Sequence, residues 1–302
     1  MNNYYNADTI IYLNGDFVRA ADAKMDFYSQ SLHYGYSVFE GIRSYRATDG
    51  STRIFKPVEH FDRLEQSAKT INMPYAWHTE ELIQNTYEVL ERNQLGDAYI
   101  RPVVYAPANM TFAPNDISFI VIQAWQMAPF LGEKLLRVRT SSFQRPNPSA
   151  FHLRSKAAGH YVNSILASQE ARANGYDEAL LLDMNGQVAE APGANVFLEK
   201  NGVLYTPPAG HILSGITRAT VIELAAQLQI PVKEQYFTIQ DMYGADAAFF
   251  CGTAVEVIGF QSLDDQSFSS PWEKSVSHQI QKAYKQLVIE PIVKEKSVSP
   301  QL

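Results

Sequence analysis

The first half of the chain alternates short apolar runs with two stretches of helical spacing. Runs typical of β-strands occur at residues 10–13, 37–45, 98–105 and 118–125. Pro57, a residue favoured in the first turn of a helix, opens the first helical stretch. Apolar side chains recur there every three or four residues, at Val58, Phe61, Leu64, Ala68 and Ile71. A second helix is expected over residues 80–93, which makes this half a small α+β unit.

The second half alternates predicted helices and strands. Strands are expected at residues 178–183, 195–199, 203–205 and 247–250. One helical face carries Val162, Ile165, Leu166 and Gln169, and Gly175 is placed to end that helix. Ser214 is expected to cap a helix over residues 215–229, which Pro231 stops, and a last helix is expected over residues 271–289.

Turn-forming residues mark a boundary near the middle of the chain. The segments 127–132 (MAPFLG) and 145–149 (RPNPS) are rich in them. We therefore predict a small N-terminal domain over residues 1–128, an interdomain loop over 129–140 and a large C-terminal domain over 141–302. The expected fold class is α/β (α+β) with two domains.

Composition and charge narrow the classes of protein. Hydrophobic residues make up 46% of the 302 residues and charged residues 19%, which is typical of globular chains. The formal net charge of −7 argues against nucleic acid as a partner. No apolar run approaches the roughly 20 residues that span a bilayer, and the N-terminus does not resemble a signal peptide. Cys251 is the only cysteine, so we expect a soluble protein of the reducing cytoplasm.

Several common catalytic motifs are missing from the sequence. Neither GxGxxG nor GxxxxGK[ST] occurs, which removes the usual nucleotide fingerprints. The seven histidines never take metal-ligand spacing such as HExxH, so no metal site is expected. A Gly-x-Ser-x-Gly elbow is also absent.

Lys156 is an unusual lysine. It lies among small residues (Ser155 to Tyr161, SKAAGHY) that lead into a predicted helix. Burial there would favour the neutral amine, which is the form that attacks an aldehyde carbon. An exposed loop lysine is the alternative on local context.

Glu190 is a carboxylate among apolar and small residues, in QVAEAPGAN. An unpaired buried carboxylate is costly, so a partner is expected. A protonated pyridine nitrogen would serve, because pyridoxal phosphate (PLP) chemistry uses an acidic partner at that atom. A structural hydrogen bond to a nearby turn is the alternative.

A phosphate could bind where the helix after Ser214 begins. The first turn leaves the backbone N–H groups of Ile216 and Thr217 without partners inside the helix, and Gly215 permits close approach. The turn at residues 251–254 (CGTA) could add a hydroxyl and further N–H donors. An amine, a carboxylate and an anion cradle together describe PLP better than each does alone.

These motifs resemble those of the branched-chain aminotransferases, which belong to the class IV aminotransferases and to the fold-type IV group of PLP enzymes. The matching segments are SLHYGYSVFEGIRSY, EHFDRLEQSAK, AYIRP, SKAAGHYVNS, EAPGANVF, LSGITR and CGTAVEV, in chain order from Ser31 to Val257. The resemblance implies transamination of leucine, isoleucine and valine with 2-oxoglutarate.

The resemblance also implies roles for single residues. Lys156 is similar to the Schiff-base lysine, Glu190 to the partner of the pyridine nitrogen and Tyr161 to the residue that bonds the cofactor's 3′-oxygen. The phosphate shell would be Arg63, Ile216, Thr217 and Thr253, although Arg63 lies off the apolar stripe of its helix. The substrate pocket would comprise Phe39, Gly41, Tyr99, Arg101, Met127, Thr253 and Ala254. Tyr34 would reach the site of a neighbouring subunit, which implies a homodimer.

Some positions depart from the usual branched-chain pattern. Tyr36 replaces a threonine, Met127 a frequent tryptophan and Ala194 a glutamate, and the loop 106–116 differs. Substrate range is therefore open to a D-amino-acid or (R)-amine transaminase of the same fold. The sequence also leaves open a PLP lyase similar to aminodeoxychorismate lyase, and a non-catalytic relative.

Overall fold

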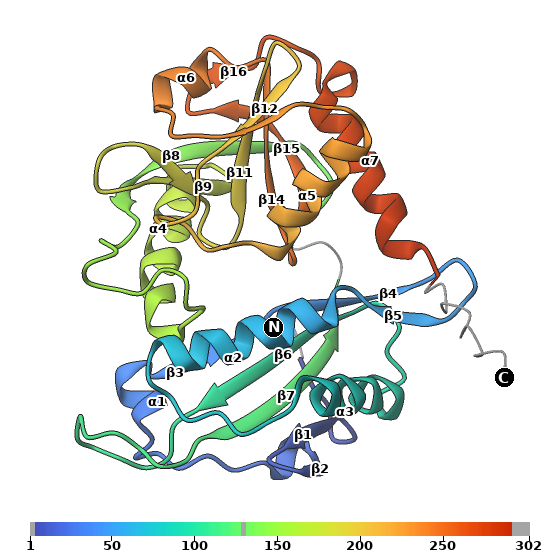
Figure 1. Ribbon diagram of the computed structural model, residues 1–302, viewed down its shortest axis with the longest axis vertical. Helices are drawn as coiled ribbons and strands as arrows, with labels where there is room; N and C mark the ends of the chain where they lie inside the picture. The colour runs from blue at the N-terminus through green and yellow to red at the C-terminus, as the bar shows by residue number, and fades with distance from the viewer. Residues whose placement is uncertain (1–3, 128–130, 292–302) are drawn as a thin grey trace, which may run out of the picture.

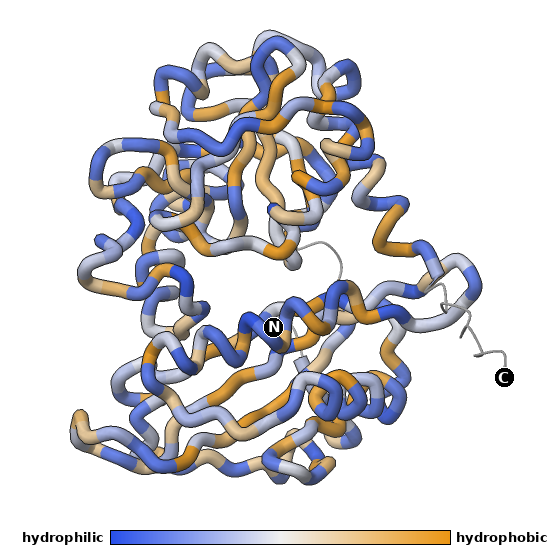
Figure 2. The backbone as a smooth tube through the Cα atoms, in the orientation of Figure 1, coloured by the Kyte–Doolittle hydropathy of each residue, from blue (hydrophilic) through white to orange (hydrophobic). Residues whose placement is uncertain are grey.

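The computed structural model describes residues 4–127 and 131–291. They form two sheets, one from each half of the chain, with helix α2 lying between them (Figure 1). Hydrophobic residues gather along the strands of both sheets (Figure 2). Each half therefore buries an apolar core. The two halves meet along α2, and also where Tyr45 and Phe55 of the first half join a core cluster of the second.

The first sheet is antiparallel throughout its described pairs. Its path runs β2-β1-β7-β6-β4-β5, with β3 also paired to β6. The strands are β1 (Ile10–Leu13), β2 (Asp16–Arg19), β3 (Ser37–Phe39), β4 (Ile42–Arg46), β5 (Thr52–Ile54), β6 (Ala98–Tyr105) and β7 (Phe119–Gln126). The helical elements are η1 (Ala20–Asp22), α1 (Gln30–Tyr34), α2 (Pro57–Thr70) and α3 (Thr79–Arg92).

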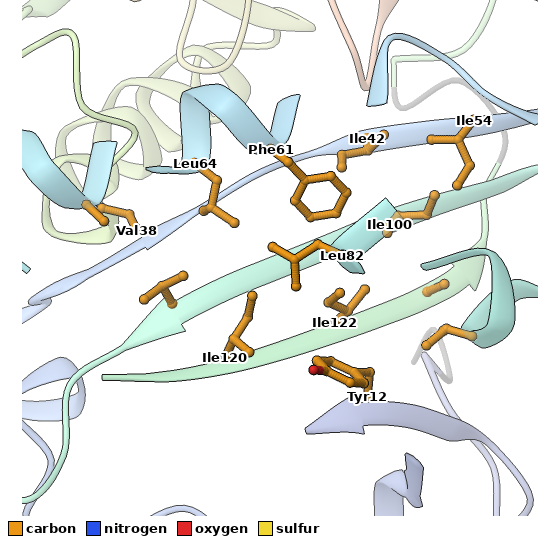
Figure 3. Close-up of a cluster of buried hydrophobic side chains, with 14 of the residues drawn as sticks. Tyr12, Val38, Ile42, Ile54, Phe61, Leu64, Leu82, Ile100, Ile120 and Ile122 are labelled. Carbon is orange, nitrogen blue, oxygen red and sulfur yellow. The ribbon is translucent and has the colours of Figure 1, made fainter. Parts of the chain in front are cut away.

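The predicted apolar stripe of α2 packs on this sheet. Phe61, Leu64 and Ala68 are fully buried, and Figure 3 shows Phe61 and Leu64 pointing at strand residues such as Ile42 and Ile100. Burial of such side chains contributes about 1.5–3 kcal/mol each. The stripe prediction is therefore confirmed for these three residues, whereas Val58 is half exposed.

The strand predicted over residues 37–45 is in fact two strands, because the strand pairing is interrupted at Glu40 and Gly41. A side chain at Gly41 would place its Cβ 1.9 Å from the Tyr99 hydroxyl oxygen, so only glycine fits beside that tyrosine. The Glu40 amide donates to the Pro102 carbonyl at 2.9 Å, which fixes the break against β6.

The second sheet is mixed. Its path runs β10-β9-β8-β15-β14-β11-β12-β13, and β10 also pairs β11, which closes six of these strands into a ring. The strands are β8 (Leu136–Gln144), β9 (Glu178–Leu182), β10 (Val188–Glu190), β11 (Asn195–Lys200), β12 (Val203–Thr206), β13 (Val232–Glu234), β14 (Ala247–Gly252), β15 (Glu256–Leu263) and β16 (Gln266–Ser267). The helical elements are η2 (Ala158–His160), α4 (Tyr161–Ala173), α5 (Ile216–Gln227), α6 (Ile239–Tyr243), η3 (Trp272–Lys274) and α7 (Val276–Ile289).

Three sequence predictions need correction here. Residues 136–140, expected in the interdomain loop, belong to β8, because their backbone pairs with β9 and β15; residues 128–130 lie outside the described part. Gly215 rather than Ser214 caps α5, and no side chain accepts a cap hydrogen bond there. The last helix breaks at Ser275, whose hydroxyl accepts from the His278 amide and starts α7 anew.

Helix α4 reverses the expected face. Its small residues Ser164, Ala167 and Ala171 are buried, and the helix packs on β8 and β9. Val162, Ile165 and Leu166 are 61%, 54% and 41% exposed, so the predicted apolar face does not cover this chain's own core. Small side chains let a helix lie close to a sheet, and here close approach decides which face turns inward.

Candidate active site

A cavity that is partly open to solvent is lined by residues from both halves of the chain. Its lining includes every residue expected to bind the cofactor: Arg63, Lys156, Tyr161, Glu190, Ile216, Thr217 and Thr253. Arg63 comes from α2 of the first half and the others come from the second. The fold therefore brings this predicted set to one place.

Lys156 enters the cavity half-buried. Its Nζ donates to the Tyr161 hydroxyl at 2.7 Å and lies 5.2 Å from the centre of the Phe39 ring. The backbone is held on both sides: the Lys156 amide donates to Ser67 Oγ at 3.0 Å, and its carbonyl accepts from the Phe39 amide at 3.1 Å. The alternative of an exposed loop lysine is therefore wrong.

Glu190 is buried, forms an ion pair with Arg145 and accepts hydrogen bonds from a backbone amide and a side-chain amide. Arg145 Nε lies 2.9 Å from Oε1, the Leu213 amide donates at 3.2 Å to Oε2, and Asn195 Nδ2 donates to Oε2 at 3.1 Å. Burial raises the pKa of the Glu190 carboxyl, and Arg145, the Leu213 amide and Lys156 oppose that rise. A carboxylate in this setting gains from a further cation in the cavity.

Arg145 and Asn195 are site residues that the sequence reasoning missed. Asn195 faces Glu190 as a direct strand partner across the β10–β11 turn, and its side chain also donates to the Leu213 carbonyl at 3.0 Å. Its place in the EAPGAN segment was the available signal. Arg145 stands among turn-forming residues after β8, where neither periodicity nor spacing sets it apart.

The start of α5 forms an anion cradle. Ile216 and Thr217 open the helix without a side-chain cap, so their backbone N–H groups and the helix dipole are available to an anion. A Cβ at Gly215 would lie 1.9 Å from Asn195 Oδ1, which makes glycine necessary beside that amide. Thr253 lines the same cavity from the turn between β14 and β15.

Arg63 reaches this cradle from α2. Its Nη1 donates to the Ser214 carbonyl at 2.9 Å, while Nε and Nη2 donate to the two oxygens of Glu40 at 2.7 and 2.8 Å. His60 Nδ1 lies 2.7 Å from Glu40 Oε2. Burial would raise the pKa of Glu40, but Arg63 and His60 outweigh it and hold that pKa well below its usual range.

An aromatic and cationic group lies beside Lys156. The rings of Phe39 and Tyr161 are 4.7 Å apart, and the Arg101 guanidinium lies 4.5 Å from the Phe39 ring centre. Arg101 Nη2 donates to the Tyr99 hydroxyl at 3.1 Å. Within the described residues, Nε of Arg101 is buried without a hydrogen-bond acceptor. This guanidinium therefore has capacity for a further anion.

The remaining predicted substrate residues are placed less directly. Ala254 follows Thr253 in its turn, and Met127 contributes a carbonyl that accepts from Arg43 Nη2 at 2.9 Å. Of the predicted substrate residues only Thr253 lines this cavity; its lining does not include Phe39, Gly41, Tyr99, Arg101, Met127 or Ala254. Tyr34 is 45% exposed, packs on Phe112 with ring centres 5.3 Å apart and does not line the cavity either.

The chemistry of the cavity fits PLP. An amine, a buried carboxylate and an uncapped helix start match an aldehyde carbon, a pyridinium nitrogen and a phosphate. Over residues 4–127 and 131–291, no cluster of three His, Cys, Asp or Glu side chains is arranged to hold a metal ion. In the same ranges no helix combines the length and apolarity needed to cross a membrane.

Comparison with known proteins agrees with this geometry. The amino-transferase class IV family model matches residues 37–263. A branched-chain-amino-acid aminotransferase of Pseudomonas aeruginosa is 39% identical over 287 residues, which cover 93% of each chain. The crystal structure of the branched-chain amino acid aminotransferase of Escherichia coli has a TM-score of 0.90 and 36% identity, over 97% of this chain and 98% of that chain. The PLP form of the enzyme from Thermobaculum terrenum has a TM-score of 0.87 and 33% identity, over 94% of both chains.

These similarities confirm two predictions from the sequence, the α/β two-domain fold of the fold-type IV group and the relationship to branched-chain aminotransferases. The chain belongs to the class IV aminotransferase family.

Proposed function

We propose that this protein is a PLP-dependent branched-chain-amino-acid transaminase, which converts L-leucine, L-isoleucine and L-valine to 2-oxo acids with 2-oxoglutarate as acceptor. The observation that carries the proposal is Lys156 Nζ, held by the Tyr161 hydroxyl in a cavity that also contains Glu190 and the start of α5. The names of the curated relatives favour this function over a lyase or a D-amino-acid enzyme.

Each cofactor residue has a distinct task. When bound, PLP supplies an electron sink for negative charge that develops on the substrate α-carbon. Lys156 would hold the cofactor and move the proton at that carbon. Tyr161 orients the Lys156 Nζ and would donate to the cofactor's 3′-oxygen. Glu190 keeps a proton on the pyridine nitrogen. Arg63, the amides of Ile216 and Thr217, and Thr253 bind the phosphate.

One pocket must accept both an aliphatic donor and a dicarboxylate. Phe39, Tyr99 and Met127 offer apolar surface, and Arg101 offers a guanidinium for the second carboxylate of glutamate or 2-oxoglutarate. Gly41 makes room for Tyr99, and Thr253 and Ala254 belong to the turn between β14 and β15, from which Thr253 lines the cavity. A similar branched-chain amino acid aminotransferase has been crystallised with N-(5'-phosphopyridoxyl)-L-glutamate and with 4-methylvaleric acid, one ligand of each kind.

Selectivity within the pocket should be modest. One methylene more or less changes binding by about 1–3 kcal/mol, so the three branched donors should differ little. The flexible Met127 in place of a tryptophan should admit larger donors such as phenylalanine or methionine.

A homodimer is part of the proposal. Tyr34 and Phe112 are 45% and 89% exposed and form one aromatic cluster, suited to closing the pocket of a partner subunit. If Tyr34 and Phe112 close the pocket of the partner subunit, a monomer has no complete pocket. Light scattering combined with an activity assay tests this, since an active monomer would contradict it.

The buried and unpaired Cys251 agrees with a reducing cytoplasmic location.

The decisive experiment measures kcat/KM for L-leucine, D-alanine and (R)-1-phenylethylamine, and pyruvate release from 4-amino-4-deoxychorismate. We expect leucine to be the fastest donor and no pyruvate. Borohydride reduction followed by peptide mapping should place the cofactor on Lys156, and Lys156→Ala should abolish turnover. A faster D-alanine or (R)-amine reaction would assign the enzyme to the D-amino-acid and (R)-amine group of the same fold.

A further inference from the structure

Glu40 lies between two substrate-pocket residues, Phe39 and Gly41, but its side chain takes part in a different contact. The carboxylate is fully buried and reaches α2, where it meets Arg63 and His60. Its own backbone is fixed by the hydrogen bond from the Glu40 amide to the Pro102 carbonyl at 2.9 Å. The cavity lining includes Arg63 but not Glu40. Glu40 therefore acts on the site through Arg63.

The hydrogens of the Arg63 guanidinium can be counted. Nε and Nη2 each give one to Glu40, and Nη1 gives one to the Ser214 carbonyl. A guanidinium has five N–H groups, so one hydrogen remains on each terminal nitrogen. The contacts with Glu40 and Ser214 fix the plane of the guanidinium and so orient these two remaining hydrogens. Two free donors on one guanidinium can bind two oxygens of one phosphate.

Net charge does not explain why a phosphate would bind where Arg63 meets the start of α5. Arg63 and Glu40 cancel, and His60 is neutral because burial lowers its pKa. The other arginines near the cradle are also paired, Arg145 with Glu190 at 2.9 Å and Arg218 with Glu234 at 2.6 Å. The dipole of α5 and the orientation of the donors therefore remain as the sources of phosphate affinity.

We propose that Glu40 is a positioning residue that aims the two free Arg63 donors at the cofactor phosphate. The inference rests on the proposed role of Arg63 in phosphate binding. Two effects compete: removal of the Glu40 charge would make the corner more attractive to an anion, whereas loss of the bidentate contact would let the guanidinium turn away. The buried two-point geometry makes the positioning effect the larger one.

The test compares PLP with pyridoxal, which lacks the phosphate but offers the same aldehyde to Lys156. Equilibrium dialysis of apo-protein gives a Kd for each compound in wild type, Glu40→Gln, Arg63→Gln and the double variant. Glu59→Gln is the control, because Glu59 is a solvent-facing carboxylate on the same helix. We expect Glu40→Gln to weaken PLP about tenfold and to leave pyridoxal unchanged. The double variant should bind PLP no more weakly than Arg63→Gln alone.

Unchanged or tighter PLP binding by Glu40→Gln would overturn the proposal, as would equal weakening of PLP and pyridoxal. If Arg63→Gln itself keeps full PLP affinity, the proposed phosphate role of Arg63 fails instead. Should Glu40→Gln not fold by circular dichroism, Glu40→Asp replaces it. That variant keeps the charge but is one methylene too short to reach Nε and Nη2, so it should also weaken PLP and spare pyridoxal.

Discussion

Each half of the chain has a buried carboxylate paired with an arginine of the cavity lining, yet the two carboxylates differ in their capacity to bind a further cation. Glu40, from the first half, is gripped by two nitrogens of Arg63 and by His60. Glu190, from the second half, has one close Arg145 nitrogen and two amide donors. The pKa of Glu40 is lowered and that of Glu190 is raised.

This difference shows that the balance between burial and the charge of the donors sets the direction of the pKa shift in two similar carboxyl groups. Both groups lose hydration, which disfavours the anion. Two charged nitrogens in bidentate geometry outweigh that loss at Glu40, so its carboxylate is satisfied within the chain. At Glu190 the compensation is incomplete and the group lines the cavity, so it remains available to a cationic ring.

The largest expected effect is on catalysis, from Glu190→Gln. Without the carboxylate the pyridine nitrogen loses its proton and the ring loses its strength as an electron sink. We expect kcat/KM for leucine to fall about 10³-fold, which corresponds to about 4 kcal/mol, while circular dichroism shows a folded protein. Turnover like that of wild type would mean that Glu190 serves only the turn.

Replacement of Glu40, in contrast to that of Glu190, should mainly lower the stability of the folded protein. Glu40→Ala leaves the buried Arg63 uncompensated, which should cost about 3 kcal/mol of the free energy of unfolding of the apo-protein. Urea denaturation measures this, with Glu59→Gln expected to stay within about 0.5 kcal/mol of wild type. Equal midpoints for Glu40→Ala and Glu59→Gln would contradict a structural ion pair.

Arg145→Met sharpens the comparison at Glu190. Loss of the guanidinium removes a cation that opposes the raised pKa of Glu190, so that pKa should rise further. Because the ionised carboxylate is needed, the acid limb of the kcat/KM profile should move to higher pH. Below that limb, kcat/KM should fall about tenfold for each pH unit by which the limb moves. A pH–rate series for both proteins measures this; an unmoved limb would separate Arg145 from Glu190.

The smallest effect concerns His60. Burial lowers its pKa below the usual 6.5, although Glu40 acts in the opposite direction. The folded state therefore binds fewer protons than the unfolded state, and this contribution to stability falls as the pH drops below about 6.5. Melting temperatures between about pH 7.5 and 5 should decline less steeply in His60→Asn than in wild type. Parallel curves would show that His60 does not titrate in this window.

Two helices show how far periodicity predicts burial. Helix α2 buries Phe61 and Leu64 as expected, because one broad sheet lies under its apolar stripe. Helix α4 exposes Val162 and Ile165, because its small residues allow the closer approach to β8 and β9. Periodicity identifies both helices, but it reports neither the partner surface nor the distance of approach.

The sequence by itself determined the long helices, many of the strands and the candidate chemistry. Strands such as β1 and β6 follow local apolar runs, and Lys156 and Glu190 are marked by their small and apolar neighbours. The tertiary structure alone decided that Arg63, on the polar side of α2, is covered by the second half of the chain and meets Ser214. It also brought Arg145 to Glu190 across 45 positions of sequence. The physical reason is that local pattern encodes hydrogen bonding and amphipathicity within one element, whereas the pairing of charges depends on how two separately folded halves meet.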